Sequence, residues 1–428
     1  MKKMNRWMKL AFITVISTFL FQACENKDEI ISYPENPASA TYKYEDIKEF
    51  DLEDLQNIES ELTKAGYDLT NVNIDTDELQ TKSVGKYLLK AIKVSTRSPH
   101  PDGSGKLIDI SGVLLVPKST LGQLRLVVAP VPTYTYNENA PSKLFKNMSW
   151  LPEGKFNYLY FWTLQAYQGF AVLLPDYPGF GDSYGQCFIP YVIEKPMARA
   201  TIDLTKAAQS VLSANKYRYK SEILVTGYSQ GAYVATAFTR EIDTNPIHGL
   251  KAKLLVAGGT PANLKHMTDI IRHSEEVKAP YLLPYAIWAF HKNGYTGLNP
   301  QDVFNEPYAT DSYKYFDGTY ESLDEYFPNK VSELFTEKII KDLDFDPTLA
   351  YANSVLKENS ITPWANKCKI VMVHGISDDI VYYQNAKDFA NQQKLAGGNI
   401  TFHSVLGDHL TAVIPYYLEA STYLSMYK

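Results

Sequence analysis

Residues 221–239 read SEILVTGYSQGAYVATAFT. The short β-branched run at the start predicts a buried strand, and the small residues at the end predict a helix. Ser229 lies in the turn between them, flanked by Gly227 and Gly231, which lack the Cβ that a very tight turn would exclude. The pattern places a hydroxyl on a strained turn at a helix N-terminus, where the helix dipole favours negative charge. It predicts a nucleophilic serine, provided that a base and an acid accompany it.

An acid and a base follow downstream, each just after a predicted strand. The strand at 370–373 leads into a Gly-x-x-Asp-x-x-Val sequence that contains Asp378, and the strand at 400–406 leads into a Gly-Asp-His turn with His409 at its tip. Functional groups gather at the carboxyl ends of parallel strands. We therefore expect Ser229, Asp378 and His409 to meet, in the chain order serine, acid, histidine.

Other residues compete for these two roles. Asp379 is the alternative acid, whereas Asp408 is interpreted as a turn residue that caps the last helix. His374 is interpreted as part of a structural His-Gly pair, and His403 as a packed or exposed strand residue.

An anionic intermediate also needs N–H donors. The backbone N–H of Gln230, at the start of the helix, is the first expected donor. The loop after an earlier strand reads APVPTYTYNENAPS, and Pro130 and Pro132 have no N–H to donate. We expect Thr133 to be the second donor, with Tyr134 as the alternative and as a substrate-binding residue.

Predicted strands and helices alternate along most of the chain. A helix is expected over 45–66, and strands over 85–96 and 107–117 are expected to form a hairpin. The alternation that follows indicates an α/β fold, with a mostly parallel sheet covered by helices on both faces. The core is expected to comprise residues 46–261 and 365–428.

Residues 262–364 interrupt this alternation and are rich in aromatic residues and proline. We expect them to form a helical cap inserted between two core strands. Aromatic side chains of the cap, including Tyr281, Tyr285, Trp288 and Phe290, are expected to line an apolar or sugar-stacking wall over Ser229. The alternative is that they form the small core of the cap itself.

The N-terminus has the order of features of an export signal. Residues 1–10 carry positive charge, residues 11–21 form an apolar run too short to span a bilayer, and Ala23 directly precedes Cys24. This segment resembles a bacterial lipoprotein signal, which implies lipidation of Cys24. The acidic ENKDE sequence that follows is similar to the surface-export signal of Bacteroidetes-type lipoproteins. We expect a polar tether over 25–45 and attachment to the outer membrane, at the cell surface, through the lipid alone.

The composition excludes several other classes of protein. The net charge is −6 with no basic stripe, which argues against a nucleic-acid partner. No spacing typical of metal ligands is found, so no metal or other cofactor is expected. Three cysteines are too few for a disulfide scaffold, and Cys187 and Cys368 are expected at opposite ends of the sheet, both as free thiols.

Several motifs together carry a family resemblance. They are the serine turn, PDYPGFGDS at 175–183, IPYVIEKPMARATIDLTKAAQ at 189–209, the insertion, and the terminal Gly-Asp-His. Over residues 85–428 the chain resembles the secretory lipase and esterase branch of the α/β-hydrolases. The resemblance implies that Ser229, Asp378 and His409 form a catalytic triad and that the insertion forms a lid.

The expected function is therefore a serine ester hydrolase acting on a small-molecule or polysaccharide-linked ester. A serine peptidase of the same fold and a non-catalytic surface binding lipoprotein are the alternatives.

Overall fold

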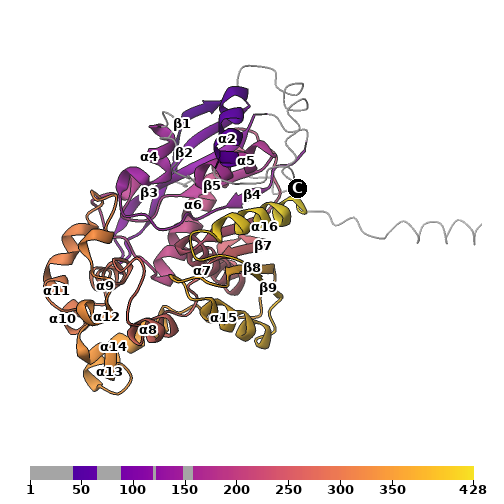
Figure 1. Cartoon of the computed structure of the whole chain (residues 1–428). Helices are drawn as coiled ribbons and strands as arrows, with labels where there is room; N and C mark the ends of the chain where they lie inside the picture. The colour runs from indigo at the N-terminus through magenta and orange to yellow at the C-terminus, as the bar shows by residue number, and fades with distance from the viewer. Residues whose placement is uncertain (1–41, 65–87, 119–121, 148–157) are drawn as a thin grey trace, which may run out of the picture.

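The computed structural model describes residues 42–64, 88–118, 122–147 and 158–428. Their strands form one nine-stranded sheet in the order β1-β2-β3-β5-β4-β6-β7-β8-β9. This sheet is the centre of the molecule, with helices packed around it (Figure 1). The strands are β1 (Lys43–Phe50), β2 (Leu89–Pro99), β3 (Leu107–Pro117), β4 (Leu126–Val128), β5 (Ala171–Pro175), β6 (Glu222–Tyr228), β7 (Lys251–Gly258), β8 (Lys369–Gly375) and β9 (Ile400–Val405).

The sheet is antiparallel at one edge and parallel elsewhere. β1, β2 and β3 pair antiparallel, and β3 pairs antiparallel with β5. From β5 onward every neighbouring pair, through β4, β6, β7 and β8 to β9, is parallel. The predicted hairpin and the predicted mostly parallel α/β sheet are both confirmed.

Helices that belong to the core cover this sheet. They are α2 (Leu52–Lys64), α4 (Pro141–Lys146), α5 (Tyr158–Tyr167), α6 (Glu194–Ala214), α7 (Gln230–Thr244), α15 (Tyr383–Leu395) and α16 (Val413–Ser425). α5 and α16 are joined by stacking of Phe161 on Tyr417, with ring centroids 4.2 Å apart.

Two consecutive residues of β6 show that α7 and α16 lie on opposite faces of the sheet. The Thr226 hydroxyl lies 2.6 Å from the Tyr416 hydroxyl on α16. A Cβ placed on Gly227 would instead point at α7, 2.2 Å from the carbonyl oxygen of Gly231. Side chains alternate along a strand, so one face of β6 packs on each helix. This arrangement holds the end of β6 rigidly between two layers.

A series of helices between β7 and β8 falls within residues 262–364, the segment predicted as a cap. It contains α8 (Leu264–Arg272), α9 (Leu282–Lys292), α10 (Pro300–Val303), α11 (Tyr308–Asp311), α12 (Val331–Leu334), α13 (Glu337–Asp342) and α14 (Ala350–Glu358). The insertion, drawn mainly in orange in Figure 1, lies beside the sheet and not within it.

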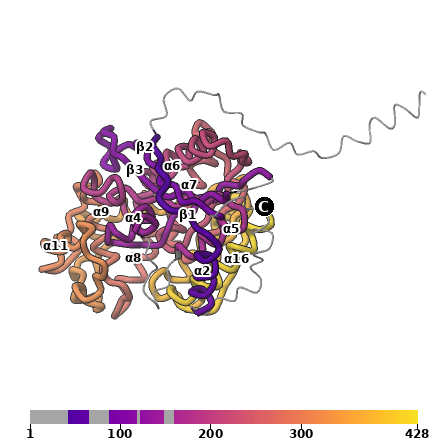
Figure 2. Tube along the Cα trace, turned by 90° about the horizontal axis from the view of Figure 1, so that it is seen from above, coloured from indigo at the N-terminus to yellow at the C-terminus, as the bar shows by residue number. Residues whose placement is uncertain are grey.

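The structure differs from the sequence prediction at the start of the described chain. Residues 43–50, predicted as the end of a tether and the start of a helix, form the edge strand β1. This segment pairs antiparallel with β2, and the backbone hydrogen bonds of that pairing favour the extended form, with a 2.7 Å ion pair between Lys90 and Asp46 beside them. Asp51 and Asp54 then exchange N–H to carboxylate bonds of 3.0 Å, and this reciprocal cap starts the helix at Leu52. Figure 2 shows β1 leading into α2.

Other predictions concern the cysteines and the N-terminal segment. Cys187 and Cys368 are both free, as predicted. Cys24, the export signal and most of the tether lie outside the described residues. In the part of the chain that the structure describes, no helix is long and apolar enough to cross a membrane.

Candidate active site

Ser229 occupies a strained turn between β6 and α7. Its φ is +57° and its ψ is −122°, in a region that side-chain-bearing residues rarely adopt. A Cβ on Gly227 would lie 2.2 Å from the Gly231 carbonyl oxygen, and one on Gly231 would lie 2.2 Å from the Pro130 carbonyl oxygen. Both glycines are therefore required for the turn, as the sequence predicts.

The turn points the serine hydroxyl at a histidine and, through it, at an aspartate. Nε2 of His409 lies 2.9 Å from Oγ of Ser229, and Nδ1 of His409 lies 2.8 Å from Oδ2 of Asp378. His409 and Asp378 are buried, whereas Ser229 is half-buried. The structure thus brings together the three residues predicted from the sequence, in a hydrogen-bonded chain from hydroxyl to carboxylate.

Both carboxylate oxygens of Asp378 have hydrogen-bond donors. Its Oδ1 accepts the backbone N–H groups of Ile380 (3.1 Å) and Val381 (2.8 Å), and its Oδ2 faces His409 and His374. Burial alone would raise the pKa of Asp378, but hydrogen bonds from the two histidines and their charges lower that pKa to about 2. The side chain is therefore an anion over the whole physiological pH range.

The competing candidates are not part of this hydrogen-bonded chain. Asp379 is exposed and lines the pocket that contains Ser229, but the carboxylate that bonds to His409 is that of Asp378. His403 is bonded to Glu419, away from the serine. Asp408 accepts the N–H groups of Leu410 (3.1 Å) and Thr411 (2.8 Å). It therefore caps the turn ahead of α16 and not that helix itself, which begins at residue 413.

The expected oxyanion donors come from two segments, the start of α7 and the loop that follows β4. Gln230 is the first residue of α7, where backbone N–H groups have no partner inside the helix. Its side-chain amide is buried, and neither Oε1 nor Nε2 has a protein partner among the described residues. Thr133 is half-buried, and its hydroxyl lies 3.4 Å from the hydroxyl of Tyr191, which lines the same pocket as Ser229.

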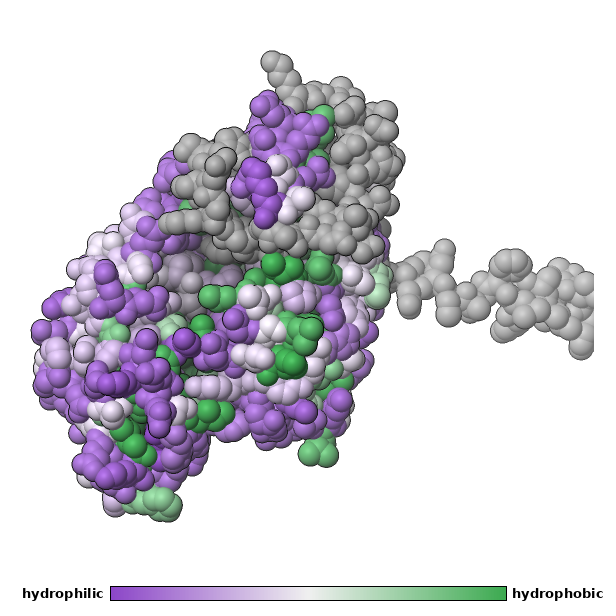
Figure 3. Space-filling view, in the orientation of Figure 1, coloured by the Kyte–Doolittle hydropathy of each residue, from purple (hydrophilic) through white to green (hydrophobic). Residues whose placement is uncertain are grey.

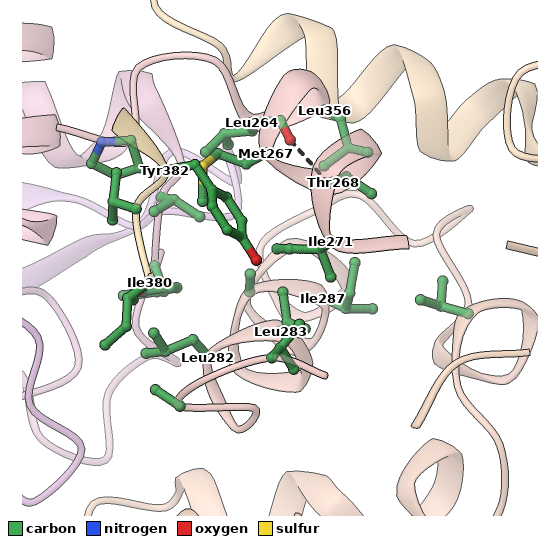
Figure 4. Close-up of a pocket in the computed structure, with 18 of the residues that line it drawn as sticks. Leu264, Met267, Thr268, Ile271, Leu282, Leu283, Ile287, Leu356, Ile380 and Tyr382 are labelled. Carbon is green, nitrogen blue, oxygen red and sulfur yellow. Dashed lines mark hydrogen bonds between the residues drawn. The ribbon is translucent and has the colours of Figure 1, made fainter. Parts of the chain in front are cut away.

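A largely apolar pocket extends from Ser229 into the insertion (Figure 4). Two helices supply facing rows of mostly aliphatic side chains. The row from α8 comprises Leu264, Met267, Thr268 and Ile271, and the row from α9 comprises Leu282, Leu283, Ala286, Ile287 and Phe290. The Thr268 hydroxyl is already bonded to the Leu264 carbonyl oxygen at 2.9 Å, which leaves the wall with little polar character.

The prediction that the named aromatic residues of the cap line this pocket is wrong for three of the four. Only Phe290 lies in the wall; Tyr281, Tyr285 and Trp288 do not. Trp288 is buried and donates its indole N–H to the Ser312 hydroxyl at 2.8 Å. Tyr285 stacks on Tyr191 with ring centroids 4.7 Å apart.

Helix geometry explains this result. Residues 282, 283, 286, 287 and 290 recur at helical spacing and share one face, whereas 281, 285 and 288 share the opposite face. That opposite face packs partly inside the insertion, where Trp288 bonds to Ser312, and partly on the core, where Tyr285 stacks on Tyr191. The alternative interpretation of these aromatics, as the core of the cap, fits the structure. Tyr134 is also outside the pocket wall, because its hydroxyl accepts the N–H of Tyr177 at 3.2 Å.

Sequence reasoning missed several residues of the pocket. Val192 lines it with a φ of +49°, which is unusual for a β-branched residue. Ile380 and Tyr382 come from the loop that also carries Asp378, and the Tyr382 ring points into the cavity in Figure 4. Their position two and four residues beyond the acid was a usable signal.

The surface around the site is mixed in character. The face in Figure 3 is mainly hydrophilic, with hydrophobic residues gathered in a few places near its middle. Ile376 and Leu410, which lie on the loops that follow β8 and β9, are 48% and 73% exposed. Both are within two residues of Asp378 or His409.

A parallel sheet with a serine, histidine and aspartate at its carboxyl edge defines the α/β-hydrolase class. A family model for secretory lipases matches residues 159–422. The chain belongs to the secretory lipase family, and it is an enzyme that hydrolyses carboxylic esters. Membership of a secretory family agrees with the export predicted from the N-terminus. A search of curated proteins gave no significant match.

Solved structures share the fold. A protein from Legionella pneumophila is 20% identical with a TM-score of 0.73, over 90% of this chain and 97% of that chain. The rice cell wall degrading esterase LipA from Xanthomonas oryzae is 22% identical with a TM-score of 0.70, over 90% and 96%. Lipase A from Candida antarctica is 18% identical with a TM-score of 0.56, over 76% and 74%.

Proposed function

We propose that this enzyme is a serine ester hydrolase whose nucleophile is Ser229. The observation that carries the proposal is the hydrogen-bonded chain from Ser229 through His409 to Asp378, with distances of 2.9 and 2.8 Å. A serine hydroxyl is a weak nucleophile unless an adjacent base removes its proton, and this geometry supplies that base.

The reaction proceeds in two halves. His409 takes the proton of Ser229 as its oxygen attacks the ester carbonyl carbon, and Asp378 stabilises the imidazolium that forms. The N–H groups of Gln230 and Thr133 hold the negative oxygen of the intermediate. His409 then gives its proton to the leaving alcohol, and a water molecule activated by His409 cleaves the acyl-serine bond.

The acyl part of the substrate is an apolar chain that lies in the pocket between α8 and α9. The rows of side chains from α8 and α9 are mostly aliphatic, and the burial of each CH₂ group there contributes about 0.8 kcal/mol. A sugar between these two helices would leave its hydroxyl groups unpaired, because Gln230, Lys278 and Asp379 line other parts of the pocket. Any carbohydrate therefore belongs to the alcohol side of the ester, outside the pocket. The cell wall esterase among the similar structures supports an acylated carbohydrate as one such alcohol.

Residues 262–364 act as the cap that sets acyl preference, because α8 and α9 of this insertion face Ser229 across the pocket.

Outside the pocket, lipidation of Cys24 would anchor the exported enzyme to the outer membrane. Labelling with a radioactive fatty acid that disappears in Cys24→Ser tests this anchor. Labelling that persists in the variant would contradict it.

The catalytic proposal is tested on the fragment that begins at residue 25. Wild type should react with a fluorophosphonate and hydrolyse a series of esters with increasing acyl length, whereas Ser229→Ala should do neither. We expect a loss of about 10⁴-fold or more in kcat with an unchanged unfolding temperature, since only one oxygen is removed. Near-normal turnover in Ser229→Ala would refute the assignment. Cleavage of peptide substrates with no cleavage of esters would favour a peptidase instead.

A further inference from the structure

His374 lies next to the proposed catalytic chain without belonging to it. It is the penultimate residue of β8 and is only 1% exposed. The edge of its ring packs on Tyr383, with centroids 6.0 Å apart and planes at 79°. The mechanism above assigns it no part.

One nitrogen of the His374 ring faces two acceptors. Nε2 lies 2.7 Å from the Val381 carbonyl oxygen and 3.2 Å from Oδ2 of Asp378. A carbonyl oxygen only accepts hydrogen bonds, so Nε2 carries the hydrogen, and the two oxygens share it. Nδ1 is buried and has no hydrogen-bond partner in the described ranges. Nε2 is therefore the ring nitrogen through which hydrogen bonds orient His374 in the described ranges.

These contacts close the loop that carries the acid. His374 precedes the loop and Val381 ends it, so the bond between them joins its two ends. Inside the loop, Oδ1 of Asp378 is held by two backbone N–H groups, whereas Oδ2 has the two histidines as its donors.

We propose that His374 is a positioning residue whose Nε2–H holds Oδ2 of Asp378 against Nδ1 of His409. A carboxylate with one oxygen fixed by the backbone still tilts about its Cβ–Cγ bond unless the second oxygen is also fixed. His374 supplies a second hydrogen-bond donor to that oxygen, beside His409. This inference rests on the proposed function, because it matters only if Asp378 orients the base.

Three variants separate positioning from packing. His374→Phe keeps a ring of similar size but removes the N–H. His374→Gln keeps an N–H at the distance of Nε2, and His374→Asn carries an amide too short to reach Asp378. The kcat and KM of each variant are measured on a soluble ester, per active site titrated with a fluorophosphonate.

We expect His374→Phe and His374→Asn to lower kcat about 10- to 100-fold, because a small misplacement of a catalytic group has effects of this size. The KM should change by less than about two-fold, since no substrate contact is lost. His374→Gln should recover most of the lost kcat. Equal losses in the Gln and Asn variants, or an unchanged kcat per titrated site in His374→Phe, would overturn the inference.

Asp378→Asn, measured in the same assay, distinguishes a failure of the His374 proposal from a failure of the proposed catalytic chain. If Asp378→Asn loses activity and the His374 variants do not, only the role of His374 is wrong. If Asp378→Asn keeps full activity, the proposed catalytic chain itself is wrong. Should His374→Phe yield no titratable sites, the comparison of Gln with Asn still decides the question.

Discussion

The hydroxyl of Tyr228 donates a 2.6 Å hydrogen bond to the backbone carbonyl oxygen of His409, and the two rings lie 5.1 Å apart. Tyr228 is the last residue of β6 and the neighbour of Ser229. One residue therefore ties the strand that presents the nucleophile to the loop that presents the base.

Removal of this tie should lower activity. In Tyr228→Phe the buried hydrogen bond is lost, which costs about 1–3 kcal/mol of stability. We expect kcat to fall up to about 10-fold as the His409 loop loses its tether, because 1.4 kcal/mol in a barrier corresponds to a tenfold change in rate. Steady-state kinetics and urea unfolding measure the two effects.

Tyr416→Phe is the matched control. Tyr416 is also buried on the same side of β6 and packs on Tyr228, with ring centroids 5.1 Å apart, but its hydroxyl bonds to Thr226 and not to the loop that carries His409. A similar loss of stability with unchanged kcat is expected. If the two variants lost the same activity, the Tyr228 bond would have no specific role.

Asp378→Asn and Asp379→Asn should differ sharply. Asp378 accepts from Nδ1 of His409, whereas Asp379 is exposed. An amide at the true orienting position favours the wrong histidine tautomer and lowers kcat about 10⁴-fold in serine proteases. The neighbouring substitution should change kcat less than about threefold. A larger effect at Asp379 on ester hydrolysis would reverse the assignment of the acid.

The stability of the enzyme should depend on pH through Asp378. Its pKa in the folded protein is about 2, below the ordinary value of 3.8. An acid whose pKa is lower in the folded than in the unfolded protein stabilises the folded state at pH values above its unfolded pKa. This stabilisation is lost as the pH falls from about 4 toward 2. The shift corresponds to about 2 kcal/mol at neutral pH.

Urea unfolding of wild type and Asp378→Asn between pH 5 and pH 2.5 measures this effect. The free energy of unfolding of wild type should fall more steeply than that of the variant across this range. If the free energies of unfolding of the two proteins fell in parallel, the pKa of Asp378 would not be lowered in the folded state.

The sequence predicts the serine turn and its partners because the chemistry there allows few alternatives. Only glycine fits at 227 and 231, and Asp378 and His409 each follow a strand in the right order. The edge strand β1 was missed because the charged 43–50 segment is compatible with a helix until its pairing with β2 is known.

The pocket wall was misjudged for a different physical reason. α9 is apolar on both faces, since one face lines the pocket and the other packs on the rest of the insertion and on core residues such as Tyr191. Helical periodicity identifies faces but does not tell which apolar face meets a cavity. The hydrogen bond from Trp288 to Ser312 turns the Trp288 side chain away from the pocket. Because the two residues are 24 positions apart, the periodicity of α9 does not reveal this contact.

The two faces of α9 should respond differently to substitution. Ala286 is half-buried and lies in the pocket wall, so Ala286→Phe places a ring in the space of the acyl chain. We expect the ratio of kcat/KM for a long-chain ester to that for an acetyl ester to fall at least about 10-fold, as for other changes of pocket size. Trp288→Ala should leave this ratio unchanged and lower the free energy of unfolding by roughly 3–5 kcal/mol, because it empties a buried site. The measurements are ester kinetics over a range of acyl lengths and urea unfolding of both variants. If Trp288→Ala changed the acyl preference and Ala286→Phe did not, the assignment of the two faces would be reversed, and the aromatic face would be the one that binds the substrate.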